Sequence, residues 1–168
     1  MMKVAVDNEL FIVEEKNFAL ASESRNRFNQ ALLEVRPSIV KVSGARIDRL
    51  LDDEDIKSII SARGVGIDLM PGFNLMTTES LRYWKIILVT EPTKEGRHIR
   101  KQVLSFLHQY MNPLVRAGHV FVVPAQDWGS MSPEEFAAKV LDPETREIVQ
   151  IPGDWGIEEI LESVEAEI

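Results

Sequence analysis

Acidic side chains gather in one short turn of this chain, directly after its clearest strand. The turn reads Glu91-Pro92-Thr93-Lys94-Glu95-Gly96, and it follows the uninterrupted apolar run 86–89. Such a run is typical of a strand buried on both faces of a parallel sheet. Ligands of open α/β sheets bind at the carboxyl ends of the strands, so this acidic turn is where we expect a ligand site.

Basic side chains follow the turn at once. Four potential cations fall within five residues: Arg97, His98, Arg100 and Lys101. They lie in the first turns of a predicted helix, whose N-terminus attracts anions, so the four side chains could contact phosphates, such as those of a nucleic acid. The alternative is that His98 packs against the protein and that the other three are solvated.

The elements that must position these residues form a β-α-β unit. Apolar residues between 99 and 114 recur at the helical period, which predicts one helix packed on the sheet. Ala117-Gly118 ends that helix, and residues 119–123 form a second buried strand. An earlier apolar run, Leu10-Phe11-Ile12-Val13, predicts a further strand that ends at Glu14. Taken alone, this position favours a solvated carboxylate for Glu14.

Further helices are predicted before the acidic turn. The segment 22–30 is polar and is expected to form a helix with Phe28 turned inward. The segments 45–51 and 55–62 carry apolar stripes at helical spacing, which predicts two short helices.

The remaining segments carry residues that mark the starts and ends of helices. Gly64 and Gly66 suit the end of a helix and a turn, and 68–78 is typical of a loop. Ser132-Pro133 predicts a helix start, and 157–168 predicts a short acidic amphipathic helix.

These elements predict an α/β fold, with a parallel sheet flanked by helices and a C-terminal acidic helical segment. We expect residues 1–125 to form the main domain, and residues 126–168 to pack on it as a continuation of the same domain.

The composition excludes several classes of protein. With 168 residues, of which 45% are hydrophobic, the chain can bury the core of a single domain. The absence of cysteine excludes a disulfide framework and a zinc-thiolate site. No signal-peptide pattern is present, and no run approaches the roughly 20 apolar residues of a membrane span. We therefore expect a cytoplasmic protein with no membrane partner.

The net charge of −8 is unevenly distributed. Residues 133–168 hold eleven acidic residues against Lys139 and Arg146, a net charge of −9, whereas the rest of the chain is close to neutral at +1. Strong non-specific DNA binding by the whole surface is therefore not expected. A basic protein surface would suit the acidic segment better. The alternative is that the acidic helices only confer solubility.

The run T-E-P-T-K-E-G-R-H-I-R resembles the Toprim signature of type IIA DNA topoisomerases, in the part represented by DNA gyrase B and its topoisomerase IV counterpart. In that family a strand ends in T-D-A-D-x-D-G-x-H-I-R, so Glu91, Thr93 and Glu95 stand where the family has three aspartates. Further segments follow in order over roughly 10–151, among them D-P-E-T-R at 142–146. The resemblance implies a Toprim-like, Rossmann-like sheet.

The resemblance also implies metal chemistry. In the family a glutamate after the first strand, here Glu14, is the general acid and a metal ligand. With an Asp-x-Asp pair it holds Mg²⁺ for phosphodiester transfer. Carried over, Glu14, Glu91 and Glu95 would form a weak Mg²⁺ site that lacks its central carboxylate at Thr93, with Lys94 as an internal counter-ion. The alternative is a solvated acidic turn whose site has decayed and which holds no cofactor.

Two further positions depart from the family pattern. The tight glycine turn after the first strand is replaced by Glu15-Lys16-Asn17, and a lysine of the DNA-facing surface is replaced by Ser38. We therefore expect a stand-alone, degenerate Toprim protein that is not catalytic and acts by binding a topoisomerase A-type subunit or, weakly, DNA. The alternatives are the Toprim fragment of a split type II DNA topoisomerase and a minimal metal-dependent nuclease.

Overall fold

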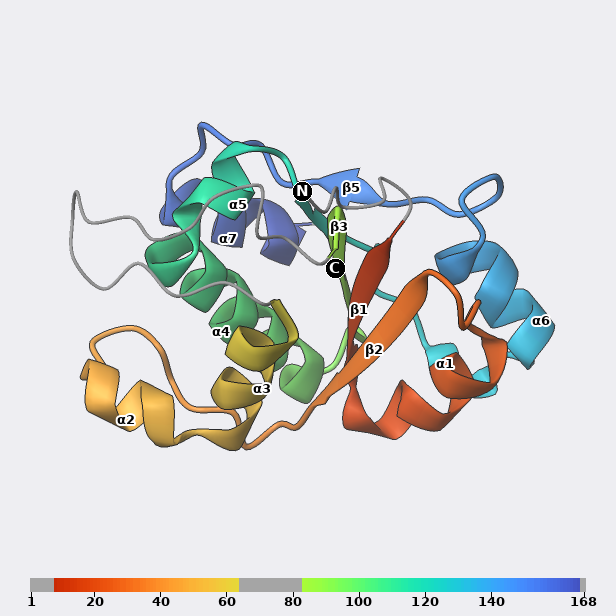
Figure 1. Ribbon diagram of the computed structural model, residues 1–168, viewed down its shortest axis with the longest axis horizontal. Helices are drawn as coiled ribbons and strands as arrows, with labels where there is room; N and C mark the ends of the chain where they lie inside the picture. Colours follow the sequence, from red (N-terminus) through yellow and green to blue (C-terminus); the bar gives the residue numbers. More distant parts are fainter. Residues whose placement is uncertain (1–7, 64–82, 167–168) are drawn as a thin grey trace.

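The computed structural model describes residues 8–63 and 83–166 (Figure 1). Within these ranges five strands form one sheet. The strands are β1 (Glu9–Glu14), β2 (Gln30–Val35), β3 (Lys85–Val89), β4 (Val120–Val122) and β5 (Val149–Gln150).

The sheet is mostly parallel and has the strand order β2-β1-β3-β4-β5. The first four strands pair in parallel, and β5 pairs antiparallel with β4. All six residues of β1 are buried, as are four of the five in β3, because both faces of these central strands are covered. The predicted α/β fold with a parallel sheet flanked by helices is confirmed.

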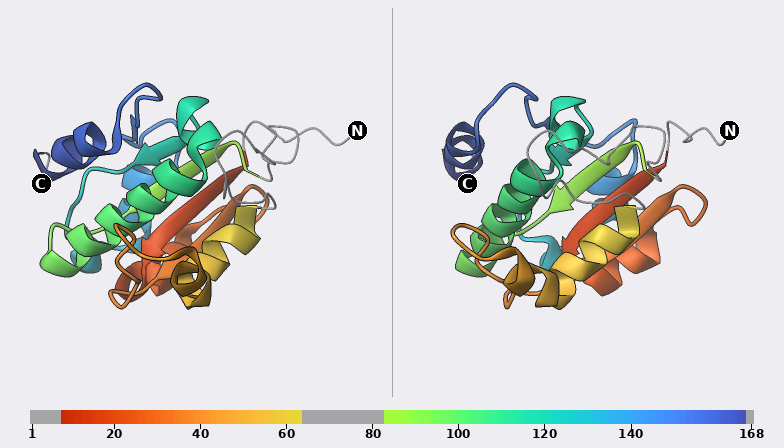
Figure 2. Two further views of the ribbon diagram at one scale, coloured as in Figure 1. Left: turned by 90° about the vertical axis from the view of Figure 1, so that its left-hand side faces the viewer. Right: turned by 60° about the vertical axis from the view of Figure 1, so that its left-hand side comes forward.

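Helices cover both faces of the sheet, in three layers (Figure 2). The helices α3, α4, α5 and α7 lie on one side, and α1 and α6 lie on the other. The helices are α1 (Phe18–Ser24), α2 (Ile47–Asp52), α3 (Glu54–Arg63), α4 (Lys94–Tyr110), α5 (Asn112–Arg116), α6 (Pro133–Phe136) and α7 (Ile157–Ala166). Shorter 3₁₀ turns span Glu15–Asn17 and Trp128–Ser130, and a π turn spans Ala137–Leu141.

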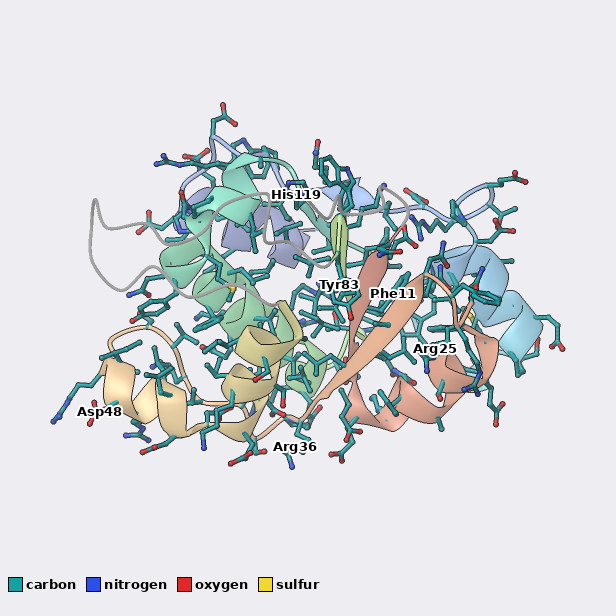
Figure 3. All side chains as sticks on the ribbon, viewed as in Figure 1. Phe11, Arg25, Arg36, Asp48, Tyr83 and His119 are labelled. Atoms are coloured by element: carbon teal, nitrogen blue, oxygen red, sulfur yellow. The ribbon has the colours of Figure 1, made fainter. Side chains whose placement is uncertain are left out.

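The alternation of side chains along β1 divides the core into two halves. Leu10 and Ile12 join the larger cluster, which includes the buried face of α4. Phe11 and Val13 join the smaller cluster, which contains the fully buried Trp128. Figure 3 shows Phe11 on β1 at the centre of the molecule.

The predicted helix at 22–30 is wrong. The helix α1 ends at Ser24, and the Phe28 side chain is 100% exposed instead of turned inward. Asn26 explains the difference, because its Oδ1 accepts a hydrogen bond from the Phe28 N–H at 3.0 Å. Asparagine side chains offer the backbone this local alternative to helix, so a turn replaces the predicted helix.

The helix predicted over 99–114 is two helices. The first, α4, ends at Tyr110, and Met111 leaves the helical region with φ −130° and ψ 36°. Pro113 lies in the first turn of α5, where its missing N–H costs nothing. The predicted end at Ala117-Gly118 is confirmed, with Gly118 at φ +80°.

The C-terminal segment is not purely helical, in contrast to the sequence-based expectation. Residues 149–150 form β5 and extend the sheet by one antiparallel strand. A strand of two residues is too short for any alternation of apolar and polar residues to show in the sequence. The predicted helix start is confirmed, since the Ser132 hydroxyl accepts a hydrogen bond from the Glu135 N–H at 3.2 Å.

The predicted helices at 45–51 and 55–62 are confirmed as α2 and α3. Gly64, Gly66 and the loop predicted at 68–78 lie outside the described residues. No helix within residues 8–63 and 83–166 has the length and apolar character that a membrane crossing requires.

Candidate functional site

The site lies at the carboxyl edge of the sheet, where β1 and β3 end side by side. The parallel register pairs Val13 with Val89, so Glu14 and Glu91 follow at the same edge. Both residues are buried, with exposed fractions of 2% and 6%. The Glu91 backbone N–H donates a hydrogen bond to Glu14 Oε1 at 2.5 Å. The predicted convergence of these two strand ends is therefore present.

The Glu91 carboxylate is held by the 3₁₀ turn that follows β1. Lys16 Nζ lies 3.1 Å from Glu91 Oε1, and Asn17 Nδ2 donates to Glu91 Oε2 at 2.8 Å. The sequence suggests Lys94 as the internal counter-ion of the carboxylates. In the structure Lys94 is exposed, and Lys16 is the lysine that pairs with Glu91. In the sequence, Lys16 and Asn17 stand out only as residues that replace a glycine turn, and that replacement is the signal that could have found them.

Thr93 begins the helix α4. Its hydroxyl accepts a hydrogen bond from the Gly96 N–H at 3.1 Å, the usual contact of an N-cap side chain. Gly96 is required by close packing, because a Cβ there would lie 2.1 Å from the Glu91 carbonyl oxygen and 2.6 Å from Glu14 Oε1. The start of α4 therefore closes directly over the two carboxylates.

The structure brings two of the three predicted metal ligands together. Glu14 and Glu91 are adjacent, whereas Glu95 is exposed. Among residues 8–63 and 83–166, no group of three or more His, Asp or Glu side chains could hold a metal ion. Mg²⁺ is usually held by one or two carboxylates together with several waters at about 2.0–2.1 Å, but here both oxygens of the Glu91 carboxylate already have donors, Lys16 and Asn17. Weak metal binding by the three carboxylates stays a prediction.

The four predicted DNA-contacting cations divide into two pairs. Arg97 and Lys101 are exposed. Arg100 is 4% exposed, and its Nε donates to Thr90 Oγ1 at 2.8 Å. His98 Nε2 lies 3.0 Å from the Ile39 carbonyl oxygen. The first pair can reach a ligand in solvent, while the second contacts the protein.

Thr90 is a site residue that sequence reasoning missed. Its hydroxyl accepts from Arg100, and its carbonyl oxygen accepts from Trp128 Nε1 at 2.9 Å. These contacts tie the end of β3 to α4 and to the turn at Trp128–Ser130. At the same edge Arg36 follows β2 (Figure 3), and its Nη2 lies 3.2 Å from Asp55 Oδ1.

Burial controls the electrostatics of the pair of carboxylates. Removal from water raises the pKa of Glu14, and the hydrogen bond from the Glu91 N–H and the nearby Lys16 charge offset only part of this effect. The pKa of Lys16 is raised mainly by its hydrogen bond to the Glu91 carboxylate. A carboxyl group with a raised pKa is better suited to donate a proton. The role of Glu14 as a general acid stays a prediction.

A mostly parallel sheet with acidic residues at the carboxyl ends of two adjacent strands defines a class of α/β domains with a site at the switch between strands. The Toprim domain family matches residues 9–125, which is more than half of the chain. This chain belongs to the Toprim domain family.

The chain is also similar to components of DNA topoisomerases. It is 42% identical over 115 residues to the DNA gyrase B subunit of Streptomyces coelicolor, covering 68% of this chain and 16% of the relative. It is 41% identical over 115 residues to the type 2 topoisomerase B subunit of Aquifex aeolicus, covering 68% and 14%. The DNA gyrase B subunit of Halalkalibacterium halodurans is 34% identical over 147 residues, covering 86% and 22%. The matched part is thus a small share of each relative.

Proposed function

We propose that this Toprim domain acts by binding and does not itself carry out metal-dependent DNA cleavage. The observation that carries the proposal is that both oxygens of the Glu91 carboxylate have donors within the protein, Lys16 and Asn17. Cleavage assisted by a divalent ion needs carboxylate oxygens that are free to coordinate it. Thr93 brings a hydroxyl group to the central position, and that hydroxyl caps α4. A degenerate site of this kind supports a binding role.

A topoisomerase A-type subunit is the partner that we propose. The relatives are named as the B subunit of a DNA gyrase or of a type 2 topoisomerase, so each is by name one part of a larger enzyme. A domain that has lost its metal ligands can keep the surface through which it meets another subunit. This partner implies a cytoplasmic location, at the nucleoid when the partner is on DNA.

Exposed acidic residues of the C-terminal segment lie on α6, on α7 and between them at Asp142, Glu144 and Glu147. Glu134 and Glu135 are exposed on α6, which packs beside α1. Glu158 and Glu159 are exposed on α7, which packs beside α4 on the other side of the sheet (Figure 2). We propose α7 as the contact for a basic partner surface, because Asp154 adds a further exposed acid there. Such charges raise the association rate more than the affinity.

The test is binding of the purified chain to gyrase and topoisomerase IV A-type subunits at low and at high salt. A complex that weakens with salt is expected, and Glu158→Lys with Glu159→Lys should slow its formation. The matched control is Glu134→Lys with Glu135→Lys, which makes the same change of charge on α6. No complex with either subunit at tens of micromolar would exclude this partner. If the chain binds DNA but neither A-type subunit, the binding role stands and its ligand is DNA.

A second candidate is the Toprim part of a split type II DNA topoisomerase or a minimal nuclease. The observation that favours it is the buried pair Glu14 and Glu91, which remains at the carboxyl edge, with the pKa of Glu14 raised. This candidate predicts nicking of supercoiled DNA that depends on Mg²⁺ or Mn²⁺.

A further inference from the structure

Two carboxylates are buried next to each other at the carboxyl edge of the sheet, and burial of charge requires compensation. Glu14 and Glu91 are 2% and 6% exposed, and Glu14 Oε1 contacts the Glu91 backbone. Lys16 Nζ contacts the pair directly, 3.1 Å from Glu91 Oε1. Arg100 is also buried here and donates to the Thr90 hydroxyl, and its charge lowers the pKa of Glu14 less than the charge of Lys16 does. Lys16 is therefore a cation in direct contact with a carboxylate of this pair.

We propose that the Lys16 ammonium group is the resident cation of this site and takes the position that a divalent metal ion would need. Lys16 and Asn17 together supply a donor to each oxygen of the Glu91 carboxylate. A metal ion could bind Glu91 only after displacing a charged donor and an amide. The inference rests on the same site as the proposed function, and it concerns the cation that occupies that site.

The approach of α4 leaves little other space at the site. The position of a Cβ on Gly96 would fall 2.6 Å from Glu14 Oε1 and 2.1 Å from the Glu91 carbonyl oxygen. Thr93 offers no charged oxygen there, and its hydroxyl already accepts from the Gly96 N–H. The open side of the carboxylate pair is the side on which Lys16 lies, since the Lys16 side chain is half exposed.

The 3₁₀ turn that supplies Lys16 also explains how a lysine takes the position of a metal ion at this site. Residues 15–17 form a 3₁₀ turn directly after β1, and this turn brings Lys16 and Asn17 back toward the end of β3. One local change therefore removes the glycine turn of the resembled pattern and introduces the cation. Lys94 is much closer in sequence to Glu91 but is exposed, so proximity in sequence alone does not produce this contact.

The test is Lys16→Met, which keeps most of the length of the side chain and removes its charge. Thermal unfolding is followed with Mg²⁺, with Mn²⁺ and with a chelator, and Mg²⁺ affinity is measured by calorimetry. The wild type should melt at the same temperature with metal and with chelator. Lys16→Met should melt at a lower temperature in chelator, regain stability with metal, and bind Mg²⁺ at least about tenfold more tightly than the wild type.

Three further variants keep the test decisive. Lys94→Met removes an exposed lysine from the same site and should behave as the wild type. Lys16→Gln also removes the charge but keeps a polar side chain, so it replaces Lys16→Met if that variant does not fold. Lys16→Arg keeps the charge and should remain insensitive to metal. A wild type that is stabilised by Mg²⁺ would overturn the inference, as would a folded Lys16→Met that gains no metal affinity. DNA nicking by the wild type bears on the proposed function instead, so the two failures are distinguishable.

Discussion

Glu14 shows how a single residue depends on the fold for its chemistry. The carboxyl group ends a strand, a position at which the sequence alone favours a solvated side chain, yet the structure buries it beneath α4. Burial raises its pKa from the ordinary value of 4.5. The free energy of unfolding should therefore carry a contribution from Glu14 that depends on pH.

The sign of this dependence follows from proton uptake. Between 4.5 and the raised folded pKa, the native state binds more protons at Glu14 than the unfolded state does, so the contribution of Glu14 to stability falls as pH rises through that window. Glu14→Gln removes the contribution and keeps an oxygen to accept the Glu91 N–H. The variant should gain stability relative to the wild type as pH rises from 4.5 toward neutrality.

Urea unfolding at several pH values measures this difference. Glu95→Gln is the control, because it removes an exposed carboxyl group from the same turn. A difference between Glu14→Gln and the wild type that does not change with pH would show that burial does not control this group.

Any DNA contact at the start of α4 should depend on Arg97 and Lys101, because these two are exposed and Arg100 is buried against Thr90. Arg97→Glu with Lys101→Glu should weaken DNA binding equally for all sequences and reduce the slope of log affinity against log salt by about 2. Arg27→Glu with Lys139→Glu is the matched control, because both residues are exposed near α1 and α6, on the other side of the sheet. Fluorescence anisotropy over a salt series measures both. An unchanged slope would place DNA binding elsewhere.

At the residue scale the sequence predicts where a side chain lies better than it predicts which groups that side chain contacts. The family resemblance places Glu14 and Glu91 in one site, and the structure has them in contact. The contacts of Lys16 depend on the path of a 3₁₀ turn, and those of Arg100 depend on which way α4 rotates on the sheet. Neither the path nor the rotation is encoded in spacing alone.

At the scale of elements, apolar periodicity is sufficient to predict the longer helices and strands. The strands β1 and β3 and the helices α2, α3 and α4 follow from it, because their apolar residues have a single consistent period. The wrong predictions concern short segments, where local contacts or length decide the structure. Asn26 ends α1 through its side chain, and β5 has too few residues to show a pattern.

One buried ion pair attaches the C-terminal segment to β1. Arg146 Nη1 donates to Glu9 Oε1 at 2.8 Å, and both side chains are 4% exposed. Gln30 Nε2 also donates to Glu9 Oε1, at 3.1 Å, and to the Leu141 carbonyl oxygen, at 2.8 Å. These contacts join the first strand, the second strand and the segment that leads to β5.

Removing one partner of this pair should be costly, because it leaves a buried charge without compensation. Arg146→Met should lower the free energy of unfolding by about 3–5 kcal/mol. Urea unfolding measures the loss, and Glu9→Leu combined with Arg146→Met should recover part of it. A loss below about 1 kcal/mol for Arg146→Met would mean that the pair behaves as an exposed one.

At the scale of the whole molecule, the site and the charge distribution both support the binding role that we propose. The carboxylate pair is compensated from within the chain, and the C-terminal acids place negative charge on both sides of the sheet, which opposes close wrapping of DNA. Charge counts from the sequence give the excess of acid. They do not reveal that α6 and α7 lie on opposite faces, since that depends on the path of the chain across β4 and β5.

The most direct test of the proposal that this domain does not itself cleave DNA is a nicking assay on supercoiled DNA with Mg²⁺ or Mn²⁺, with the chain alone and with a gyrase A-type partner. The lysine-compensated site predicts no conversion to nicked or linear DNA beyond that produced by the A-type partner alone. Metal-dependent nicking or linearisation that appears with the wild-type chain and disappears in Glu14→Gln would contradict the account.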